Sequence, residues 1–207
     1  LEISKCDHVF LTDKELQIEE MKRVKDVAKE ILIVDHHDIL YRDEISKNVI
    51  MVNPKFYGVN INTPAGLLTY ITLEKIYPEI KKAIHLAAIG VYCDWAENEL
   101  AFFIKENVFS VYPCLRGEIY IREKKKEKKP AKISRSVLVK LSRIVTSAYF
   151  HSLKEGAYTA IQALEKSVEE EDPLTILYGR DEDSKRLIEW DAEMRFSPPA
   201  KRPIQDY

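Results

Sequence analysis

The stretch Ile31-Leu32-Ile33-Val34-Asp35-His36-His37-Asp38 decides the fold that this sequence predicts. Its four apolar residues are typical of a short strand that is buried on both faces, as strands of parallel sheets are. In an open α/β sheet, functional groups collect beyond the carboxyl ends of the strands. Carboxylate and imidazole groups at that place suit a divalent metal ion. The alternative is a polar strand end whose histidines only hydrogen-bond to nearby loops, and four such residues in succession favour the metal site.

The composition indicates an ordinary soluble protein. Of 207 residues, 45% are hydrophobic and 32% are charged, which provides enough apolar material for a sizeable core. The net charge of −2 excludes a global field that would steer the chain to nucleic acid or a membrane. The sequence shows neither an apolar run of membrane-spanning length nor a signal peptide. Its three scattered cysteines predict a reducing, cytoplasmic location and no thiolate zinc site.

The apolar pattern of the first half predicts an α/β fold. An amphipathic helix is expected at 15–30, and strands are expected at 8–12, 31–34 and 49–52. The order strand, helix, strand implies a parallel sheet with a right-handed crossover, and we expect helices on both of its faces.

Two further helices are predicted after the sheet. The first has Thr63 as its N-cap and Pro64 as its first helical residue, and it ends near Tyr77. The second, at 79–91, is apolar on most sides and therefore buried, and it delivers Asp94 at its end.

The basic run 122–135 is the expected boundary within the chain. It carries eight Lys or Arg residues against two Glu, a net charge of +6, and it has few apolar residues, which predicts a loop or linker. Beyond it we expect a smaller, mainly helical region with an αα-hairpin at 137–148 and 157–168, joined by a turn at 153–156, then a short strand at 174–178 and a helix at 184–194. The predicted domains are 1–107, a connector at 108–135, and 136–207.

Three separate segments end in residues that can bind a metal. Asp13 follows the first strand, Asp35-His36-His37 follows the second, and Asp94 follows the buried helix. If the first two strands are neighbours, Asp13 and the histidines meet at one edge of the sheet. Carboxylate and imidazole without thiolate favour Mn²⁺ or Mg²⁺. Each Asp alone would be interpreted as a solvated strand end or helix cap, and only their joint placement favours a site.

These residues resemble the motifs of the DHH phosphoesterases, a superfamily that includes RecJ-type exonucleases, oligoribonucleases and cyclic-dinucleotide phosphodiesterases. Ile33-Val34-Asp35-His36-His37 resembles the DHH signature, and Leu11-Thr12-Asp13 resembles the motif whose Asp bridges two metals. Val52-Asn53-Pro54 with Thr63-Pro64-Ala65-Gly66-Leu67 is similar to the stretch that follows DHH. Ala88-Ile89-Gly90-Val91-Tyr92-Cys93-Asp94 looks like the fourth motif. The resemblance covers roughly residues 8–100.

The resemblance implies a role for each site residue. Asp13 would bridge two Mn²⁺ or Mg²⁺ ions, and His36 would bind one of them together with Asp94. Asp35 would orient a histidine, and His37 would approach the scissile phosphate or the attacking water. The family's N-terminal strand, which ends in a His and two Asp, has no counterpart upstream of Asp13. If that segment lies outside this chain, we expect the site to bind two ions. If the protein does not have it, we expect that catalysis has been lost.

The resemblance further implies a metal-dependent phosphodiesterase, most like a RecJ-type exonuclease acting on single-stranded DNA or RNA in replication or repair. The alternative is an inactive replication scaffold that binds GINS and the replicative helicase, because Leu141-Ser142-Arg143-Ile144 and the following hairpin resemble the helical connector of archaeal RecJ-like proteins. A third option is a small-nucleotide phosphodiesterase of the same fold.

Some residues allow a second interpretation. Lys124, Lys125, Lys126, Lys128 and Lys129 could track a phosphate backbone, or they could form only a solvated loop. Tyr92 and Trp95 beside Asp94 could stack on a base, although such aromatics more often belong to a core. His85 on the apolar helix is interpreted as a core histidine.

Overall fold

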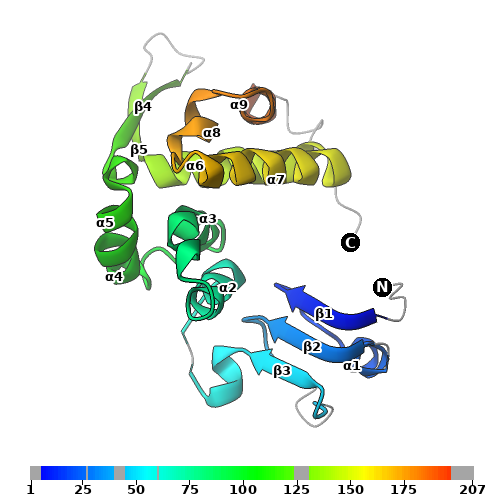
Figure 1. Ribbon diagram of the computed structural model, residues 1–207. Coiled ribbons are helices and arrows are strands. Elements are labelled where there is room, and N and C mark those ends of the chain that lie inside the picture. Colours follow the sequence, from blue (N-terminus) through cyan, green and yellow to red (C-terminus); the bar gives the residue numbers. More distant parts are fainter. Residues whose placement is uncertain (1–5, 27, 40–44, 60, 124–130, 197–207) are drawn as a thin grey trace. The chain divides into compact units, whose positions relative to one another are not determined.

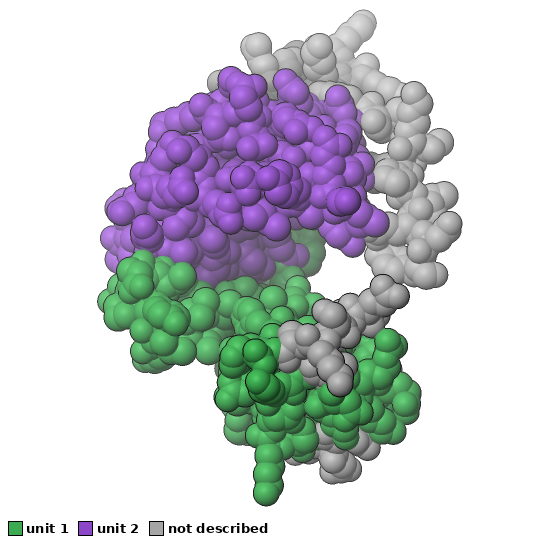
Figure 2. Space-filling model, turned by 45° about the vertical axis from the view of Figure 1, so that its right-hand side comes forward, with its two compact units in different colours: residues 1–81, 94–100 green, residues 82–93, 101–207 purple. Residues whose placement is uncertain are grey.

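A computed structural model describes residues 6–26, 28–39, 45–59, 61–123 and 131–196. Its internal contacts divide the chain into two compact units (Figure 2). Unit 1 comprises Leu1–Lys81 with Asp94–Leu100, and unit 2 comprises Lys82–Cys93 with Ala101–Tyr207. The predicted domains 1–107, 108–135 and 136–207 stay a prediction, because two compact units do not show which segments fold independently.

Unit 1 contains a three-stranded parallel sheet (Figure 1). The strands β1 (Cys6–Thr12), β2 (Ala28–Val34) and β3 (Val49–Val52) lie in the order β1-β2-β3. Thr12 is in register with Val34, and Val34 is in register with Val52. All three strands therefore end at the same level, and the predicted parallel α/β arrangement is confirmed.

One face of this sheet is covered by a helix along its length, whereas on the other face Phe10 and Ile50 stay 50% and 65% exposed. On one face, Leu16, Met21 and Val24 from helix α1 (Ile18–Lys25) and the turn before it form a buried cluster with alternate residues of β2 and β3. On the other face, α2 (Ala65–Glu74) contacts β1 and β2, and the hydroxyl of Thr69 lies 3.3 Å from that of Thr12. The cluster supplies the apolar burial that stabilises the sheet, while α2 covers the ends of its strands.

Several predicted boundaries in unit 1 are wrong. Helix α1 ends at Lys25 rather than 30, because β2 already begins at Ala28, where it is in register with Cys6 of β1. Pro64, not Thr63, is the N-cap of α2. The 3₁₀ helices of the region are η2 (Pro54–Tyr57) and η3 (Pro78–Ala83), and the latter occupies the start of the predicted helix 79–91.

Unit 2 is mainly helical. Its elements are α3 (Ile84–Cys93), α4 (Ala101–Phe103), the π-helical η4 (Ile104–Val108), α5 (Phe109–Val111), η5 (Pro113–Arg116), β4 (Glu118–Glu123), β5 (Ala131–Ser136), α6 (Val137–His151), α7 (Leu153–Glu169), α8 (Leu174–Tyr178) and α9 (Glu182–Phe196). The long helix α6 contacts α3, α7, α8 and α9 (Figure 1). The buried carboxylate of Asp191 in α9 pairs with Lys140 and Arg143 of α6, which compensates its burial.

The structure corrects two predictions in this unit. Residues 174–178 form helix α8 rather than a strand: the Asp172 carboxylate accepts from the backbone N–H of Leu174, and Gly179 at φ +58° ends the helix. The basic run 122–135 is not entirely a loop, because β5 pairs antiparallel with β4. Residues 124–130 lie outside the described part of the chain.

Gly156 makes the helical hairpin possible. The predicted turn at 153–156 is wrong, since only Ser152 separates α6 from α7 and Gly156 lies within α7. A Cβ atom at Gly156 would lie 1.8 Å from the backbone oxygen of Ala148 in α6. The two helices can approach this closely only because residue 156 has no side chain.

We predict that Gly156→Ala lowers the free energy of unfolding by about 1–3 kcal/mol, the usual cost of overpacking a buried contact. Gly117→Ala is the matched control, because its Cβ would meet ordinary contacts of 3.4 and 3.5 Å. Urea denaturation followed by circular dichroism measures both variants. Equal stability of the two variants would contradict this account of the hairpin.

His85 is a buried core histidine, as the sequence indicates. Its Nδ1 lies 3.1 Å from the carbonyl oxygen of Lys82, which can only accept, so Nδ1 donates. Its Nε2 lies 2.9 Å from the Ser167 hydroxyl. Burial lowers the pKa of His85 to about 4 from its ordinary 6.5, because it disfavours the charged ring.

We predict that His85 makes the fold sensitive to acid. In the unfolded chain this residue binds a proton near pH 6.5, whereas in the folded chain it does so only near pH 4, so stability falls as the pH drops through this window. The full effect is about 3 kcal/mol. Urea midpoints measured between pH 7 and pH 4 should decline less steeply in His85→Gln than in the unsubstituted chain. Parallel declines would exclude His85 as the cause.

Candidate metal centre

The ends of β1 and β2 place Asp13 and Asp35 side by side. The backbone N–H of Asp13 donates to the carbonyl of Val34 at 3.1 Å, and that of Asp35 donates to the carbonyl of Val52 at 3.0 Å. The hydrogen bonding of the sheet thus continues one residue beyond each strand. Asp13 then adopts a left-handed backbone with φ +53°, which is uncommon for a residue with a side chain and turns the chain away from the sheet.

The side chains of Asp13, His36 and His37 form one compact group. One ligand atom from each of the three residues lies within 4.8 Å of the others. His36 Nε2 is 3.3 Å from Asp13 Oδ1 and 3.7 Å from Asp94 Oδ2. The structure therefore brings together the residues that the sequence singled out on three separate segments, and all of them belong to unit 1.

His37 is held from two sides. Its Nδ1 lies 2.8 Å from Oδ1 of Asp35, a carboxylate that is only 2% exposed. Because a carboxylate accepts, Nδ1 carries the hydrogen and Nε2 keeps the lone pair. The side-chain amide of Asn53 donates to the His37 backbone carbonyl at 3.0 Å. A carboxylate behind a histidine in this way fixes the ring of a metal ligand or of a general base.

His36 and Asp13 stabilise one another's charge, whereas the charge of Asp94 is disfavoured. The hydrogen bond to Asp13 raises the pKa of His36 above 6.5, assisted by the negative charges of Asp94 and Asp13, while burial opposes the shift. The same hydrogen bond to His36 lowers the pKa of Asp13. Burial, followed by repulsion from Asp13, raises the pKa of Asp94. The group therefore favours a positive charge among its carboxylates, which His36 supplies when it is protonated.

The donor set suits a divalent cation. The carboxylates of Asp13 and Asp94 and the imidazole of His36, without a thiolate, are typical ligands for Mn²⁺, and the oxygen donors also suit Mg²⁺. Such an ion would supply the positive charge that the group favours. Within the described ranges one group of this kind is found, which suffices for a single ion. A second ion stays a prediction.

Sequence reasoning missed one residue of the site. A side-chain hydrogen bond that His36 donates to Asn62 contributes to the raised pKa of His36, and the backbone N–H of Asn62 donates to the Glu99 carboxylate at 3.1 Å. Asn62 thus links the site to the segment that carries Asp94. An asparagine in a polar loop gives no periodic signal, so only the fold reveals it.

Two other predictions about the site have different outcomes. The prediction that Trp95 belongs to a core is wrong, because its side chain is 85% exposed. The lysines proposed to bind nucleic acid, Lys124, Lys125, Lys126, Lys128 and Lys129, lie outside the described residues. Their role stays a prediction.

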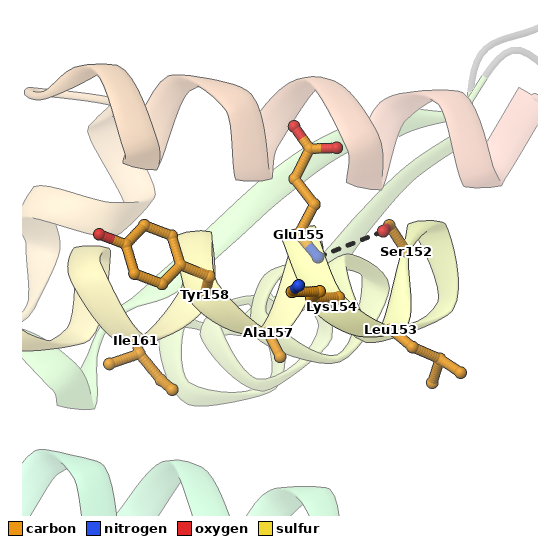
Figure 3. Close-up of a pocket in the computed structure, with 7 residues that line it drawn as sticks. All are labelled: Ser152, Leu153, Lys154, Glu155, Ala157, Tyr158 and Ile161. Atoms are coloured by element: carbon orange, nitrogen blue, oxygen red, sulfur yellow. Dashed lines mark hydrogen bonds between the residues drawn. The ribbon is translucent and has the colours of Figure 1, made fainter.

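Helix α7 carries a second surface of interest (Figure 3). Leu153, Ala157 and Ile161 recur every four residues and therefore lie on one side of the helix. With Tyr158 they line a largely apolar hollow of about 680 Å³. Glu155 points to the other side, where it pairs with Arg186 of α9. We call this surface the α7 face; exposed apolar patches of this kind often bind other proteins.

Comparison with known proteins adds no family assignment. No protein-family model, curated protein or solved structure matches this chain. No helix in the described part of the chain is both long and apolar enough to cross a bilayer. The function must therefore be argued from the site itself.

We predict that the purified chain binds Mn²⁺ and that Asp13→Asn and His36→Gln each weaken binding at least about tenfold, the usual loss when a ligand shell is disrupted. Asp38→Asn is the control, because this exposed carboxylate pairs with Lys55 and lies outside the compact group. Isothermal titration calorimetry at neutral pH measures all four proteins. Equal weakening by Asp38→Asn would indicate nonspecific cation binding instead of a defined site.

Proposed function

We propose that this chain is a divalent-metal-dependent phosphodiesterase with a DHH-type domain, acting on single-stranded nucleic acid as RecJ-type exonucleases do. The observation that carries the proposal is the compact group at the strand ends: Asp13, His36 and His37, with Asp94 beside His36. The parallel α/β sheet of unit 1 and the order of the four motif-like segments support the same family. Nucleic acid as the substrate rests on the family resemblance alone.

Asp13, His36 and Asp94 are the residues that would hold the ion. When bound, Mn²⁺ or Mg²⁺ supplies Lewis acidity for a phosphoryl oxygen. The carboxylates of Asp13 and Asp94 give the site its negative charge. The 3.3 Å contact between Asp13 Oδ1 and His36 Nε2 keeps these two donor atoms close together. Preorganised donors cost little rearrangement when the reaction proceeds.

His37 would handle the proton of the reaction. Asp35 holds Nδ1 of His37, so Nε2 can accept a proton from the attacking water and later release it to the leaving oxygen. Asp35 is buried and would act as a positioning residue, because its contact orients His37 and disfavours the opposite tautomer. This arrangement fits hydrolysis, in which one water molecule adds across the phosphorus–oxygen bond.

A second candidate is a non-enzymatic scaffold of the replication machinery, with GINS and the replicative helicase as partners. The α7 face favours it, because apolar side chains that share one side of a helix are suited to protein docking. A scaffold would have no need for the ordered pair of His37 and Asp35 beside potential metal ligands. We therefore place hydrolysis first.

We predict that the full-length protein with Mn²⁺ shortens labelled single-stranded DNA or RNA, and that Asp13→Asn lowers kcat at least about 100-fold because it removes a proposed ligand. His37→Gln should lower kcat by about 10²–10⁴ while leaving Mn²⁺ binding within a few-fold, since it removes proton transfer. Asp38→Asn should retain the full rate. Denaturing gel electrophoresis over a series of substrate lengths separates an exonuclease from a small-nucleotide phosphodiesterase.

One combination of results would reject hydrolysis. If the full-length protein binds Mn²⁺ tightly but turns over neither long strands nor dinucleotides, the site is a relic and the scaffold becomes the preferred function. Turnover that survives Asp13→Asn would instead point to a contaminating nuclease.

A further inference from the structure

Trp95 has an unusual conformation beside the candidate site. Its side chain is 85% exposed, although tryptophan is highly buried on average. Its backbone is left-handed, with φ +57°, two residues after the end of α3. Glycine is the usual residue in that conformation after a helix, because a Cβ atom is strained there. Neither core packing nor backbone preference accounts for a tryptophan at this position.

Trp95 is adjacent in sequence to a residue of the site. It directly follows Asp94, whose Oδ2 lies 3.7 Å from His36 Nε2. The same segment is linked to the opposite loop, because the backbone N–H of Asn62 donates to the Glu99 carboxylate at 3.1 Å. Ile61, next to Asn62, is 49% exposed. Asp94 and Asn62 thus both interact with His36, and each has an exposed apolar neighbour in the chain, Trp95 and Ile61 respectively.

A polar centre whose residue Asp94 is followed in the chain by an exposed indole matches the chemistry of a nucleotide. The negatively charged phosphodiester would interact with the ion that the carboxylates and the imidazole hold. The base has a flat face, which stacks on an aromatic ring. Stacking is tolerant of sequence because every base has such a face. A strained, exposed residue that costs stability is most often kept at a site where it contacts a ligand.

We propose that Trp95 is the stacking platform for a nucleobase flanking the scissile phosphodiester. The proposal rests on the proposed function, because it assigns the substrate class of that same site. It goes further in predicting that bases, and not the sugar–phosphate backbone alone, contribute to binding. It also predicts that Trp95 acts without contributing to the stability of the fold.

Intrinsic fluorescence can test the proposal without any turnover. The chain has two tryptophans, and the other, Trp190, is buried and stacked on His151 with ring centroids 4.5 Å apart. Trp190→Phe therefore leaves Trp95 as the single reporter. In metal-free buffer, a deoxyadenosine dinucleotide should quench its emission in a saturable way, and the same dinucleotide backbone without bases should not. Equal effects of the two ligands, or no effect of either, would overturn the proposal.

Substitutions of Trp95 provide the second arm. Trp95→Gly should keep or raise the thermal midpoint, since glycine adopts φ +57° without strain, yet weaken dinucleotide binding about fivefold to a hundredfold. Trp95→Phe should retain part of the affinity. Tyr178→Ala is the matched control, because Tyr178 is also exposed but belongs to unit 2. A Trp95→Gly variant that binds the dinucleotide as tightly as the unsubstituted chain would refute the platform.

Hydrolysis separates this proposal from the proposed function. Trp95→Gly should raise KM for a single-stranded oligonucleotide and leave KM for an abasic strand of equal length unchanged. If the unsubstituted protein cleaves neither strand, the phosphodiesterase proposal fails, and the fluorescence result still decides on stacking. If instead Trp95→Gly abolishes self-association in sedimentation velocity with no effect on either ligand, Trp95 is a protein contact and the stacking proposal is wrong.

Discussion

The parallel register of the three strands is the constraint on which the rest of unit 1 depends. Thr12, Val34 and Val52 lie at one level, and a further hydrogen bond beyond each of the first two strands sets the positions of Asp13 and Asp35. A shift of one residue would turn the side chains of a strand to the opposite face. The buried cluster of α1 against β2 and β3 makes such a shift costly, so apolar packing fixes the geometry of the polar site.

The site also depends on charge compensation. Asp13 and Asp94 repel one another, and His36 between them reduces this repulsion when it is protonated. A divalent cation would do the same more strongly, which links the electrostatics of this group to the proposed chemistry. The buried Asp35 behind His37 adds a carboxylate whose position is set by the sheet and not by the ligand.

Strong local patterns predicted the longer helices and the parallel strands, whereas weak patterns left most of the short elements unpredicted. The run 31–34 and the apolar stripe of 137–148 indicated β2 and α6 because burial imposes a clear period on each. Residues 174–178 were misassigned as a strand, because five residues carry too little periodicity and the deciding contacts are a cap by Asp172 and the turn at Gly179. The close contact at Gly156 joins residues of two helices, which no local pattern can indicate.

The sequence by itself determined which residues could bind a metal, because carboxylates and imidazoles directly after apolar runs are visible without a structure. It could not determine that Asp13, His36, His37 and Asp94 meet, since their proximity follows from strand order, register and the path of the chain after α3. Only the tertiary structure decided that Asn62 joins them and that Trp95 is exposed. Exposure and proximity are properties of packed segments that lie far apart along the chain.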